Sequence, residues 1–555
     1  MKKKAFLLLK NWCDTLLSYQ VRTNTPYTDG ALLCPACHVL HGRAADLCFP
    51  LTVLWSETGE EKYLDKADIL IDWSEYNLKT QDGLWYNDIT NRWYATSAFS
   101  AMSIGEAIYH FGDKLPSEYK NKWMAIFVRM CDTFATLDTR ESFKPVTNYY
   151  CGIAALLAMA WRLTSNEKYY EKSKYWLDVA LSRFDRDGLL YGEGYPMEFS
   201  DGSHAVDMGY ALEESIPLLL RYASLTGEYA ELFRARLRDH LEFLLPDGAI
   251  DDSFGIRHNK WTYWGSRTSD GLIEGLALVL DDPMFANACQ RVLTLYEKCT
   301  NDGLLSMPMA HESGEPACIH HTFAHAKALA ALICADIPEI KEAKLPCEEK
   351  YGIKKYQNEN LLLVSHGKWR ATFSACHSYS SELTANGGGS MNLLYHDNYG
   401  ILCAATSAHY HPTEPLNQQY LRNASNPPSM TAQFIIDGKM ACQDKNARLT
   451  ASDLDISVTS SAENWKAKYL FENDRLCITL EADDGVYQLP IVCSKNSIVT
   501  LSDGNKTLRI DGGVTLRSTY PLDTDIDLRI FNQVGGLAYL SVSVKVQGKV
   551  IFTIE

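Results

Sequence analysis

A four-residue signal, Asp-Gly followed by two apolar residues, recurs in the first part of the chain and constrains its fold more than any other feature. It occurs at 82–85, 187–190, 247–250 and 302–305. A second signal precedes the first three copies, at 58–60, 164–166 and 226–228. The two signals begin 21 to 24 residues apart, which leaves room for one helix of about four to five turns. Repetition in this order predicts a helical array of helix, tight turn, helix and long polar loop.

Hydrophobic periodicity extends this pattern over residues 1–345, which read as roughly twelve helices in six hairpins. Segments at 98–111, 151–163 and 324–335 carry small residues along one face. Small residues allow helices to pack closely, so these segments suit an inner ring surrounded by longer amphipathic helices. We therefore expect an N-terminal (α/α)6 toroid, with an open superhelix of helix pairs as the competing all-α arrangement.

The period changes after a linker with two prolines at about 337–352. Residues 346–555 contain many short alternating segments separated by Gly, Asn and Asp turns. Such a run predicts a C-terminal antiparallel β-sandwich docked on the toroid. The side chains of this domain that we expect to reach the toroid are Arg370, His377, His409 and His411.

Composition limits the class of function and the compartment. The formal net charge of −16 over 555 residues argues against a nucleic-acid partner, because little basic surface is available to neutralise phosphates. An acidic sugar is still possible, since a pocket can be locally positive.

The chain has no apolar run of membrane-spanning length. Its basic start lacks a signal-peptide cleavage site, and many of its 16 cysteines occupy core-like positions. These features predict a cytoplasmic protein, or a periplasmic one if a leader has been trimmed.

The loop at 247–275 holds the densest group of polar and aromatic residues. Its candidates for binding are Trp261, Tyr263, Trp264 and Arg267. Loops on a rigid scaffold concentrate binding chemistry, and aromatic faces beside charged groups suit a sugar ring. The competing interpretation is a surface loop held down by its aromatic side chains.

Two more clusters lie near expected helix starts. Asn148 and Tyr150 begin an inner helix, where free backbone N–H groups favour an anion, although Asn148 also suits a simple helix cap. Further on, Glu193 lies in a Gly-Glu-Gly turn, and His204 and Tyr210 have a spacing that allows one shared helical face. A solvated loop is the competing interpretation of this second cluster.

The last expected helix opens with His321, four residues before His325. That spacing places both rings on one face, but no HExxH pattern accompanies them. We interpret one histidine as facing the pocket and the other as structural.

A CxxC motif, Cys34 to Cys37, is followed closely by His38 and His41. This combination suggests zinc, but a structural site needs four ligands and no second CxxC or histidine pair lies at finger spacing. We expect no metal, with zinc near Cys34 and Cys37 as the alternative. His41 and Arg43, which open a helix, are then candidates to line the toroid cavity.

Tyrosine, histidine, asparagine and arginine around one cavity suit β-elimination on a uronic acid. The reaction needs a neutralised carboxylate, a base for the neighbouring C–H proton and an acid for the leaving oxygen. The candidate catalytic residues are Tyr150, Tyr210, Tyr263, His204 and His321. The candidate substrate-binding residues are Asn148, Arg267, Trp264, His41, Arg43, Glu193 and Trp261. The expected partner is an acidic oligo- or polysaccharide.

Two other functions fit the same residues. Glycoside hydrolysis needs two carboxylates across the bond, which Glu193, Asp251 and Asp252 are candidates to supply. A carbohydrate-binding protein without catalysis needs only the pocket, and mutation of its Tyr and His residues would weaken binding alone.

The helical part resembles bacterial toroid polysaccharide lyases, in the broad sense of the heparinase II/III and alginate lyase group. The segments DGALLCPACHVLHGR and QDGLWYND more particularly resemble lyases that remove rhamnose from glucuronate caps on arabinogalactan glycans. The resemblance implies a tyrosine base in the toroid, at Tyr150, Tyr210 or Tyr263. The HxHxDxxSF-type strand motif of the heparinase and alginate branch is absent; the nearest segment, at 408–412, lacks its Asp and Ser-Phe. This departure puts a catalytic histidine from the sandwich in doubt.

Overall fold

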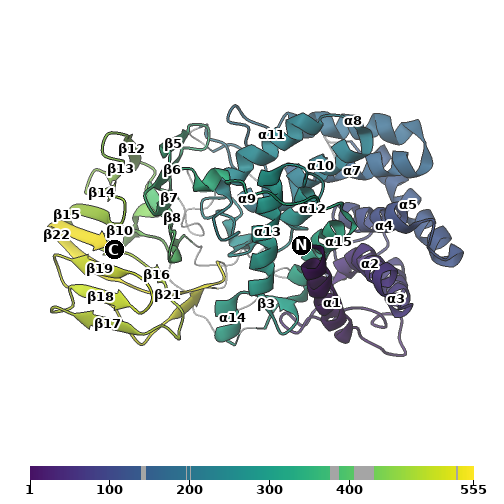
Figure 1. Ribbon diagram of the computed structural model, residues 1–555, viewed down its shortest axis with the longest axis horizontal. Coiled ribbons are helices and arrows are strands. Elements are labelled where there is room, and N and C mark those ends of the chain that lie inside the picture. The colour runs from purple at the N-terminus through teal and green to yellow at the C-terminus, as the bar shows by residue number, and fades with distance from the viewer. Residues whose placement is uncertain are drawn as a thin grey trace.

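The computed structural model describes residues 1–138, 146–194, 197–199, 202–314, 316–375, 387–405, 430–532 and 535–555. The molecule is elongated, with a helical domain at one end and a sheet domain at the other (Figure 1). The longer helices are α1 (Lys2–Ser18), α2 (Cys48–Thr58), α3 (Lys62–Asn77), α4 (Ser97–Phe111), α5 (Ser117–Thr136), α7 (Thr147–Thr164), α8 (Glu167–Leu181), α10 (Ile216–Thr226), α11 (Ala230–His240), α13 (Pro283–Lys298) and α15 (Ile319–Cys334). Within these described ranges, no helix combines the length and apolar character needed to cross a membrane.

The Asp-Gly signals form one recurring hairpin at the ends of the outer helices. Bridges close it at Lys79 with Trp85, Phe184 with Leu190 and Leu244 with Ile250. After α13, the short strands β3 (Thr300–Asn301) and β4 (Leu304–Leu305) pair in the same way. A further copy lies after α1, where Gln20 bridges to Leu32 around Asp29-Gly30. This copy, Asp29-Gly30-Ala31-Leu32, fits the same sequence signal and adds a fifth to the four named above.

The glycine of each turn packs against the next outer helix. The contacts run from Gly30 to Ile69 of α3, Gly83 to Arg129 of α5, Gly188 to Arg236 of α11, Gly248 to Arg291 of α13 and Gly303 to Thr15 of α1. The last contact returns to the first helix, and α1 also packs against α15. The two ends of the helical domain therefore meet, as a toroid requires.

The helical segment that follows Asp207 has an irregular start. α9 (Met208–Tyr210) passes into one turn of π-helix at Ala211–Ser215 before α10 begins. π turns are rare and occur frequently at functional sites. This one carries Glu214, four residues after Tyr210, and both side chains face the cavity described below. Helix α12 (Leu272–Leu276) is short, because the preceding loop extends to Gly271.

The sheet domain contains two main antiparallel sheets. The first has five strands in chain order: β5 (Gly352–Tyr356), β6 (Leu361–His366), β7 (Trp369–Ser374), β8 (Ser390–His396) and β9 (Gly400–Ala404). The second runs β12 (Arg448–Ser452), β13 (Ser457–Ala462), β14 (Trp465–Phe471), β15 (Leu476–Gln488), β22 (Ser543–Ile554), β19 (Thr515–Ser518), β18 (Thr507–Ile510) and β17 (Val499–Ser502). Strands β10 (Gln433–Ile436) and β11 (Lys439–Met440) extend it beside β15, and β16 (Ile491–Val492), β21 (Leu537–Leu540) and β20 (Ile530–Asn532) form a smaller sheet.

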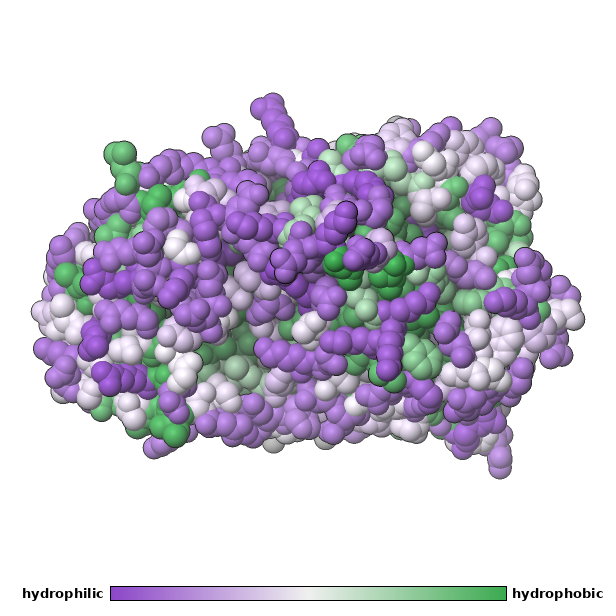
Figure 2. All heavy atoms as spheres, viewed as in Figure 1, coloured by the Kyte–Doolittle hydropathy of each residue, from purple (hydrophilic) through white to green (hydrophobic). Residues whose placement is uncertain are grey.

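The five-stranded sheet lies between the helical domain and the large sheet. On one face, Leu363 and Tyr395 join the core of the helical domain. On the other face, Phe373 and Leu394 join the core shared with Tyr469 of the large sheet. Because both faces are covered, strands β6, β7 and β8 are almost entirely buried and lack the alternation of a solvent-facing strand. In contrast, the outer face of the molecule seen in Figure 2 is largely hydrophilic.

A buried ion pair joins the two domains. The guanidinium of Arg370 on β7 binds Glu242, with Nη2 and Oε1 separated by 3.0 Å. Tyr351 donates to the same carboxylate over 3.0 Å. Arg370 thus reaches the helical domain, as expected. His377, His409 and His411 lie outside the described residues.

Candidate active site

A cavity of about 320 Å³ lies where the inner helices begin. Its wall comes from the lead-in to α2, the loop before α4, the start of α7, the α9–π segment and the loop before α12. The lining residues are Arg43, Asn87, Asn91, Trp93, Thr96, Phe99, Val146, Asn148, Tyr149, Tyr210, Glu214, Arg257, Lys260 and Thr268. Three of them are cationic, and one is a carboxylic acid. The lining therefore contains more cationic than acidic side chains, on a chain of net charge −16.

Tyr210 lies at the centre of the hydrogen-bonding groups in this wall. Lys260 Nζ donates to its phenolic oxygen over 3.0 Å, and Thr268 Oγ1 is also within hydrogen-bond distance. The guanidinium of Arg257 lies 4.8 Å from the ring centroid. The backbone N–H of Tyr210 is capped by Asp207 Oδ1 at 2.8 Å, which fixes the start of the helix. The phenol is thus held rigidly beside a lysine ammonium group.

Asn148 and Glu214 form a second polar group on the wall. Asn148 Nδ2 donates to Glu214 Oε1 over 3.3 Å. Burial, with the nearby carboxylate of Asp270, raises the pKa of Glu214 well above its usual value. Behind them, Glu193 accepts from Asn148 N at 2.9 Å and pairs with Arg257 Nη1 at 3.0 Å. Burial raises the pKa of Glu193 to about 7, although Arg257 opposes the shift.

Arg43 reaches the cavity from the short 3-10 helix at Gly42–Leu47. Its Nη2 lies 2.7 Å from Asp46 Oδ2 and 3.3 Å from Asp270 Oδ1. Lys327 on α15 contacts the same two carboxylates. Because the two cations and two carboxylates balance each other in a buried network, Arg43 is held in one position with its charge retained.

Aromatic rings form another part of the wall. Trp93 Nε1 donates to Tyr149 OH over 2.8 Å, and the two ring centroids are 5.7 Å apart. The ring centroids of Phe99 and Tyr149 are 5.6 Å apart, and the Arg43 guanidinium lies 5.0 Å from the Phe99 ring centroid. Trp93 retains 37% of its surface exposed. The exposed part of the Trp93 indole, beside the buried rings, is an apolar surface on which a sugar ring can pack.

The three candidate tyrosines lie in different places. Tyr210 lines the cavity, whereas Tyr150 turns away from it and stacks on Trp176 of α8 with ring centroids 5.9 Å apart. Burial raises the pKa of Tyr150. Tyr263 lies in another pocket, of about 530 Å³, between the helical and sheet domains. Their expected convergence in a single site therefore does not occur.

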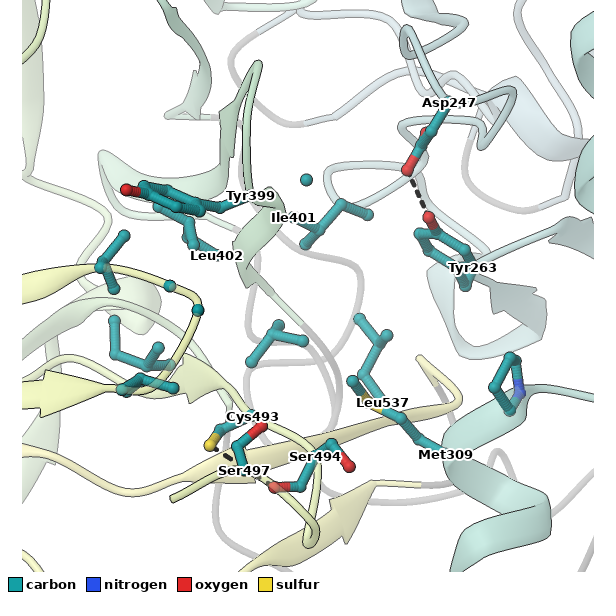
Figure 3. A pocket seen from close by; sticks show the side chains of 18 of the residues that line it. Asp247, Tyr263, Met309, Tyr399, Ile401, Leu402, Cys493, Ser494, Ser497 and Leu537 are labelled. Carbon is teal, nitrogen blue, oxygen red and sulfur yellow. Dashed lines mark hydrogen bonds between the residues drawn. The ribbon is translucent and has the colours of Figure 1, made fainter. Parts of the chain in front are cut away.

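Figure 3 shows the interdomain pocket, in which Tyr263 donates a hydrogen bond to Asp247. Burial and the Asp247 carboxylate raise the pKa of Tyr263. Besides Asp247, the lining carries the acidic residues Glu312, Asp397 and Asp511, against the single cation Lys298. This pocket is larger than the toroid cavity, but its charge opposes an anionic substrate.

The candidate histidines lie outside the cavity lining. His204 stacks on Tyr191 at 4.0 Å and points its Nδ1 towards Asp185 and Glu359, near the sheet domain. His321 is buried against Trp264, with ring centroids 5.5 Å apart. Burial, followed by the charge of Arg267, lowers the pKa of His321 well below its usual value.

The other predicted binding residues pack around these groups rather than on the cavity wall. Trp261, Trp264 and Arg267 are buried, and Trp261 Nε1 donates to the carbonyl oxygen of Ile250 over 2.6 Å. His41 lies beside Cys37 and Cys318. Of the predicted residues, Arg43, Asn148 and Tyr210 line the cavity, with Glu193 directly behind them.

Sequence reasoning missed several wall residues. Tyr149 adjoins the predicted Tyr150, but one residue is a rotation of about 100° on a helix, and the start of the helix sets which phenol faces inward. Lys260 lies within the loop at 247–275, directly before the predicted binding residue Trp261. No sequence pattern near Glu214 indicated that it faces the cavity, because the orientation of its side chain depends on the π turn. Asn87, Asn91 and Trp93 follow the Asp82-Gly83 turn, at the repeat position that supplies the wall elsewhere.

The carboxylates considered for hydrolysis do not face each other across the cavity. Asp251 accepts from Ser253 and Thr372 in the domain interface. Asp252 Oδ1 accepts from Met208 N at 2.6 Å, at the start of α9. Neither lines the cavity, so the paired arrangement that hydrolysis needs is not formed by these residues.

Comparison with known proteins identifies the family. The chain matches the ulvan lyase N-terminal domain over residues 9–348 and the ulvan lyase C-terminal domain over residues 353–555. It is 37% identical over 435 residues to a broad-specificity ulvan lyase of Formosa agariphila, a match that covers 74% of this chain and 67% of that protein.

Solved structures share the fold at low sequence identity. Heparinase III superposes with a TM-score of 0.55 at 12% identity, covering 99% of this chain and 84% of that one. A chondroitin AC lyase variant of Streptomyces coelicolor gives 0.50 at 12% identity, with 100% and 79% covered. The predicted order of a helical toroid and an antiparallel sheet domain is confirmed, as is the broad resemblance to toroid polysaccharide lyases. The narrower likeness to rhamnose–glucuronate lyases stays a prediction.

These matches decide between the three functions that the sequence left open. The protein is an enzyme of the polysaccharide lyase type, rather than a hydrolase or a binding protein without catalysis. Both of its domains match the same family, in the same order, over nearly the whole chain. The chain belongs to the ulvan lyase family.

Proposed function

We propose that this lyase cleaves a uronate-containing polysaccharide of the ulvan type by β-elimination, in the cavity around Tyr210. The observation that carries the proposal is the Lys260–Tyr210 pair, at 3.0 Å, in a wall with three cations and one carboxylic acid of raised pKa. A positive cavity suits an anionic sugar, and a phenol beside an ammonium group suits proton transfer. The relative from Formosa agariphila supports ulvan as the substrate.

The first requirement is neutralisation of the uronate carboxylate, which acidifies the hydrogen on the neighbouring carbon. Asn148 offers an amide N–H, and Glu214 offers a carboxylic acid O–H while it is protonated. Arg43 adds a fixed positive charge on the same wall. A protonated carboxyl that donates to a substrate carboxylate strengthens as charge moves onto that carboxylate, so it favours the transition state.

Tyr210 is then the base. Its phenolate, stabilised by Lys260, takes the proton from the carbon next to the carboxylate. The electron pair of that C–H bond forms the new carbon–carbon double bond, and the glycosidic C–O bond breaks with its electrons on the leaving oxygen. That oxygen takes a proton from the Tyr210 hydroxyl or from Tyr149, the other phenol on the wall. Return of the proton by Tyr210 itself restores the starting state.

We also propose that the helical domain is an (α/α)6 toroid. The supporting pattern is the chain of glycine contacts that runs from α1 to α3 and α5, and from α8 to α11, α13 and back to α1. Paired with α2, α4, α7, α10, α12 and α15, these outer helices make six hairpins.

The test uses ultraviolet absorbance during incubation of the purified protein with ulvan, with heparan and chondroitin chains, and with rhamnose-capped glucuronate oligosaccharides. Elimination creates a double bond conjugated with the carboxylate, so absorbance rises; hydrolysis releases reducing ends without this signal. We expect a rise with ulvan. The Tyr210→Phe variant should lose at least about a hundredfold in kcat/KM, while Tyr150→Phe and Tyr263→Phe stay within a few-fold of wild type. Equal losses in all three variants, or new reducing ends without absorbance, would refute the mechanism.

A further inference from the structure

A cluster of three thiols and one imidazole lies where the beginning and the end of the helical domain meet. Its members are Cys34, Cys37 and His41, from the segment before α2, and Cys318, the N-cap of α15. Some 277 residues separate His41 from Cys318 in the chain. The CxxC motif supplies two of the sulfurs, and the fold brings the third from the far end of the domain.

The distances fit a tetrahedral metal ion. All four ligand atoms lie within 4.8 Å of one another. His41 Nε2 is 3.3 Å from Cys37 Sγ and 3.6 Å from Cys318 Sγ. Zinc bound at its usual Zn–S and Zn–N lengths holds sulfur and nitrogen ligands about 3.6 Å apart and two sulfurs about 3.8 Å apart. One ion at the centre of the cluster would therefore contact all four atoms after small side-chain movements.

The backbone prepares the CxxC segment for this arrangement. His38 N donates to the carbonyl oxygen of Cys34 over 3.0 Å, and Cys34 N donates to that of Val39 over 3.0 Å. These bonds close a tight turn in which His38 adopts a positive φ of 57°. The turn carries both sulfurs to the same side. Cys34 and Cys318 are fully buried and His41 is almost so, whereas Cys37 is half-buried.

We propose that Cys34, Cys37, His41 and Cys318 form a structural zinc site. Three thiolates and one imidazole in tetrahedral geometry are the ligand set that zinc prefers. Four protein ligands leave no open position for water or substrate, so the ion would stabilise the fold without joining the reaction. The site is distinct from the cavity, and it depends on neither the proposed substrate nor Tyr210 as the base.

Its role follows from its place in the toroid. The ion would tie the first inner-helix segment to the last inner helix, across the seam where α1 packs against α15. Arg43 follows His41 by two residues and lines the cavity. Loss of the ion should therefore lower the melting temperature and, through Arg43, raise KM more than it lowers kcat.

The first experiment measures metal content by mass spectrometry in the full chain purified without chelators and with reductant. We expect about one zinc ion per chain. Cys318→Ser should lose the zinc, whereas Cys334→Ser, at the other end of the same helix, should keep it. Treatment with a thiol-modifying reagent should release the zinc to a colorimetric chelator. Wild-type protein with reduced thiols and less than about a tenth of an equivalent of any transition metal would overturn the proposal.

A second measurement covers the case in which Cys318→Ser does not fold. Wild-type protein grown with cobalt should show sulfur-to-cobalt charge-transfer bands and the visible bands of a tetrahedral cobalt thiolate centre. A spectrum of octahedral cobalt, or a disulfide among Cys34, Cys37 and Cys318 in freshly purified protein, would also overturn it. None of these readouts uses enzyme activity. The zinc proposal can therefore be refuted while the proposed lyase mechanism stands, and the lyase mechanism can be refuted while the zinc proposal stands.

Discussion

The ammonium group of Lys260 donates a hydrogen bond to the phenolic oxygen of Tyr210 over 3.0 Å, although the two residues are 50 positions apart and come from different segments of the cavity wall. A cation at this distance stabilises negative charge on the phenol oxygen. If Tyr210 is the base, Lys260 sets the pH at which it becomes active.

Replacement of Lys260 by methionine should therefore change the pH profile as well as the rate. The side chain keeps its approximate length but loses its charge, so the Tyr210 phenolate becomes harder to form. We expect kcat/KM at neutral pH to fall by about tenfold or more, and the rising limb of its pH profile to move to higher pH. Initial rates of double-bond formation between pH 6 and 10 measure both effects. A uniform loss of rate with an unmoved limb would show that Lys260 only supports the fold.

Glu214 should control the opposite limb of the profile. Burial and the Asp270 carboxylate raise the pKa of Glu214 well above its usual value, which favours the protonated carboxyl that we propose as a donor to the substrate carboxylate. As pH rises through that raised pKa, the group ionises and repels the anionic sugar, so KM should rise. Glu214→Gln keeps an N–H donor that does not titrate, and should flatten this alkaline rise while retaining activity. Glu214→Ala should lose about tenfold or more in kcat/KM at all pH values. An alkaline rise that persists in the Gln variant would assign it to another group.

The Arg370–Glu242 ion pair should matter for the docking of the two domains. Arg370→Met leaves the Glu242 carboxylate in the interface with Tyr351 and the half-exposed Lys354 as its partners among the described residues. Loss of one member of a buried pair costs roughly 3 kcal/mol. We expect a lower midpoint in urea for the single variant and partial recovery in Arg370→Met/Glu242→Leu, which removes the buried charge. Glu242→Leu should be measured in wild type as well. If it lowers the stability of Arg370→Met by as much as it lowers that of wild type, the two residues are not coupled.

The sequence predicted those features that depend on local periodicity. Helical spacing followed by strand alternation indicated the order of the two regions, and the Asp-Gly signals marked real hairpins, because one turn type requires a fixed pair of residues. Features that depend on tertiary contacts were not predictable. The choice between Tyr149 and Tyr150 depends on the helix start, Glu214 faces the cavity through a π turn, and Cys318 joins Cys34 only when the toroid closes.

Closure of the toroid itself can be tested at Gly303. A Cβ atom at this residue would collide with Thr15 of α1, whereas one at Gly59, which follows α2, would meet open space. Both glycines have a positive φ, 76° and 74°, so alanine introduces similar backbone strain of about 1–2 kcal/mol at each. The matched pair Gly303→Ala and Gly59→Ala therefore separates the collision from the strain.

We expect Gly303→Ala to lower the melting temperature by several degrees more than Gly59→Ala. Combining Gly303→Ala with Thr15→Ala should recover part of the difference, because the collision with the Thr15 hydroxyl is removed. Equal melting temperatures for the two single variants would show that the turn after α13 is not pressed against the first helix in solution, and the toroid would then be open at this seam.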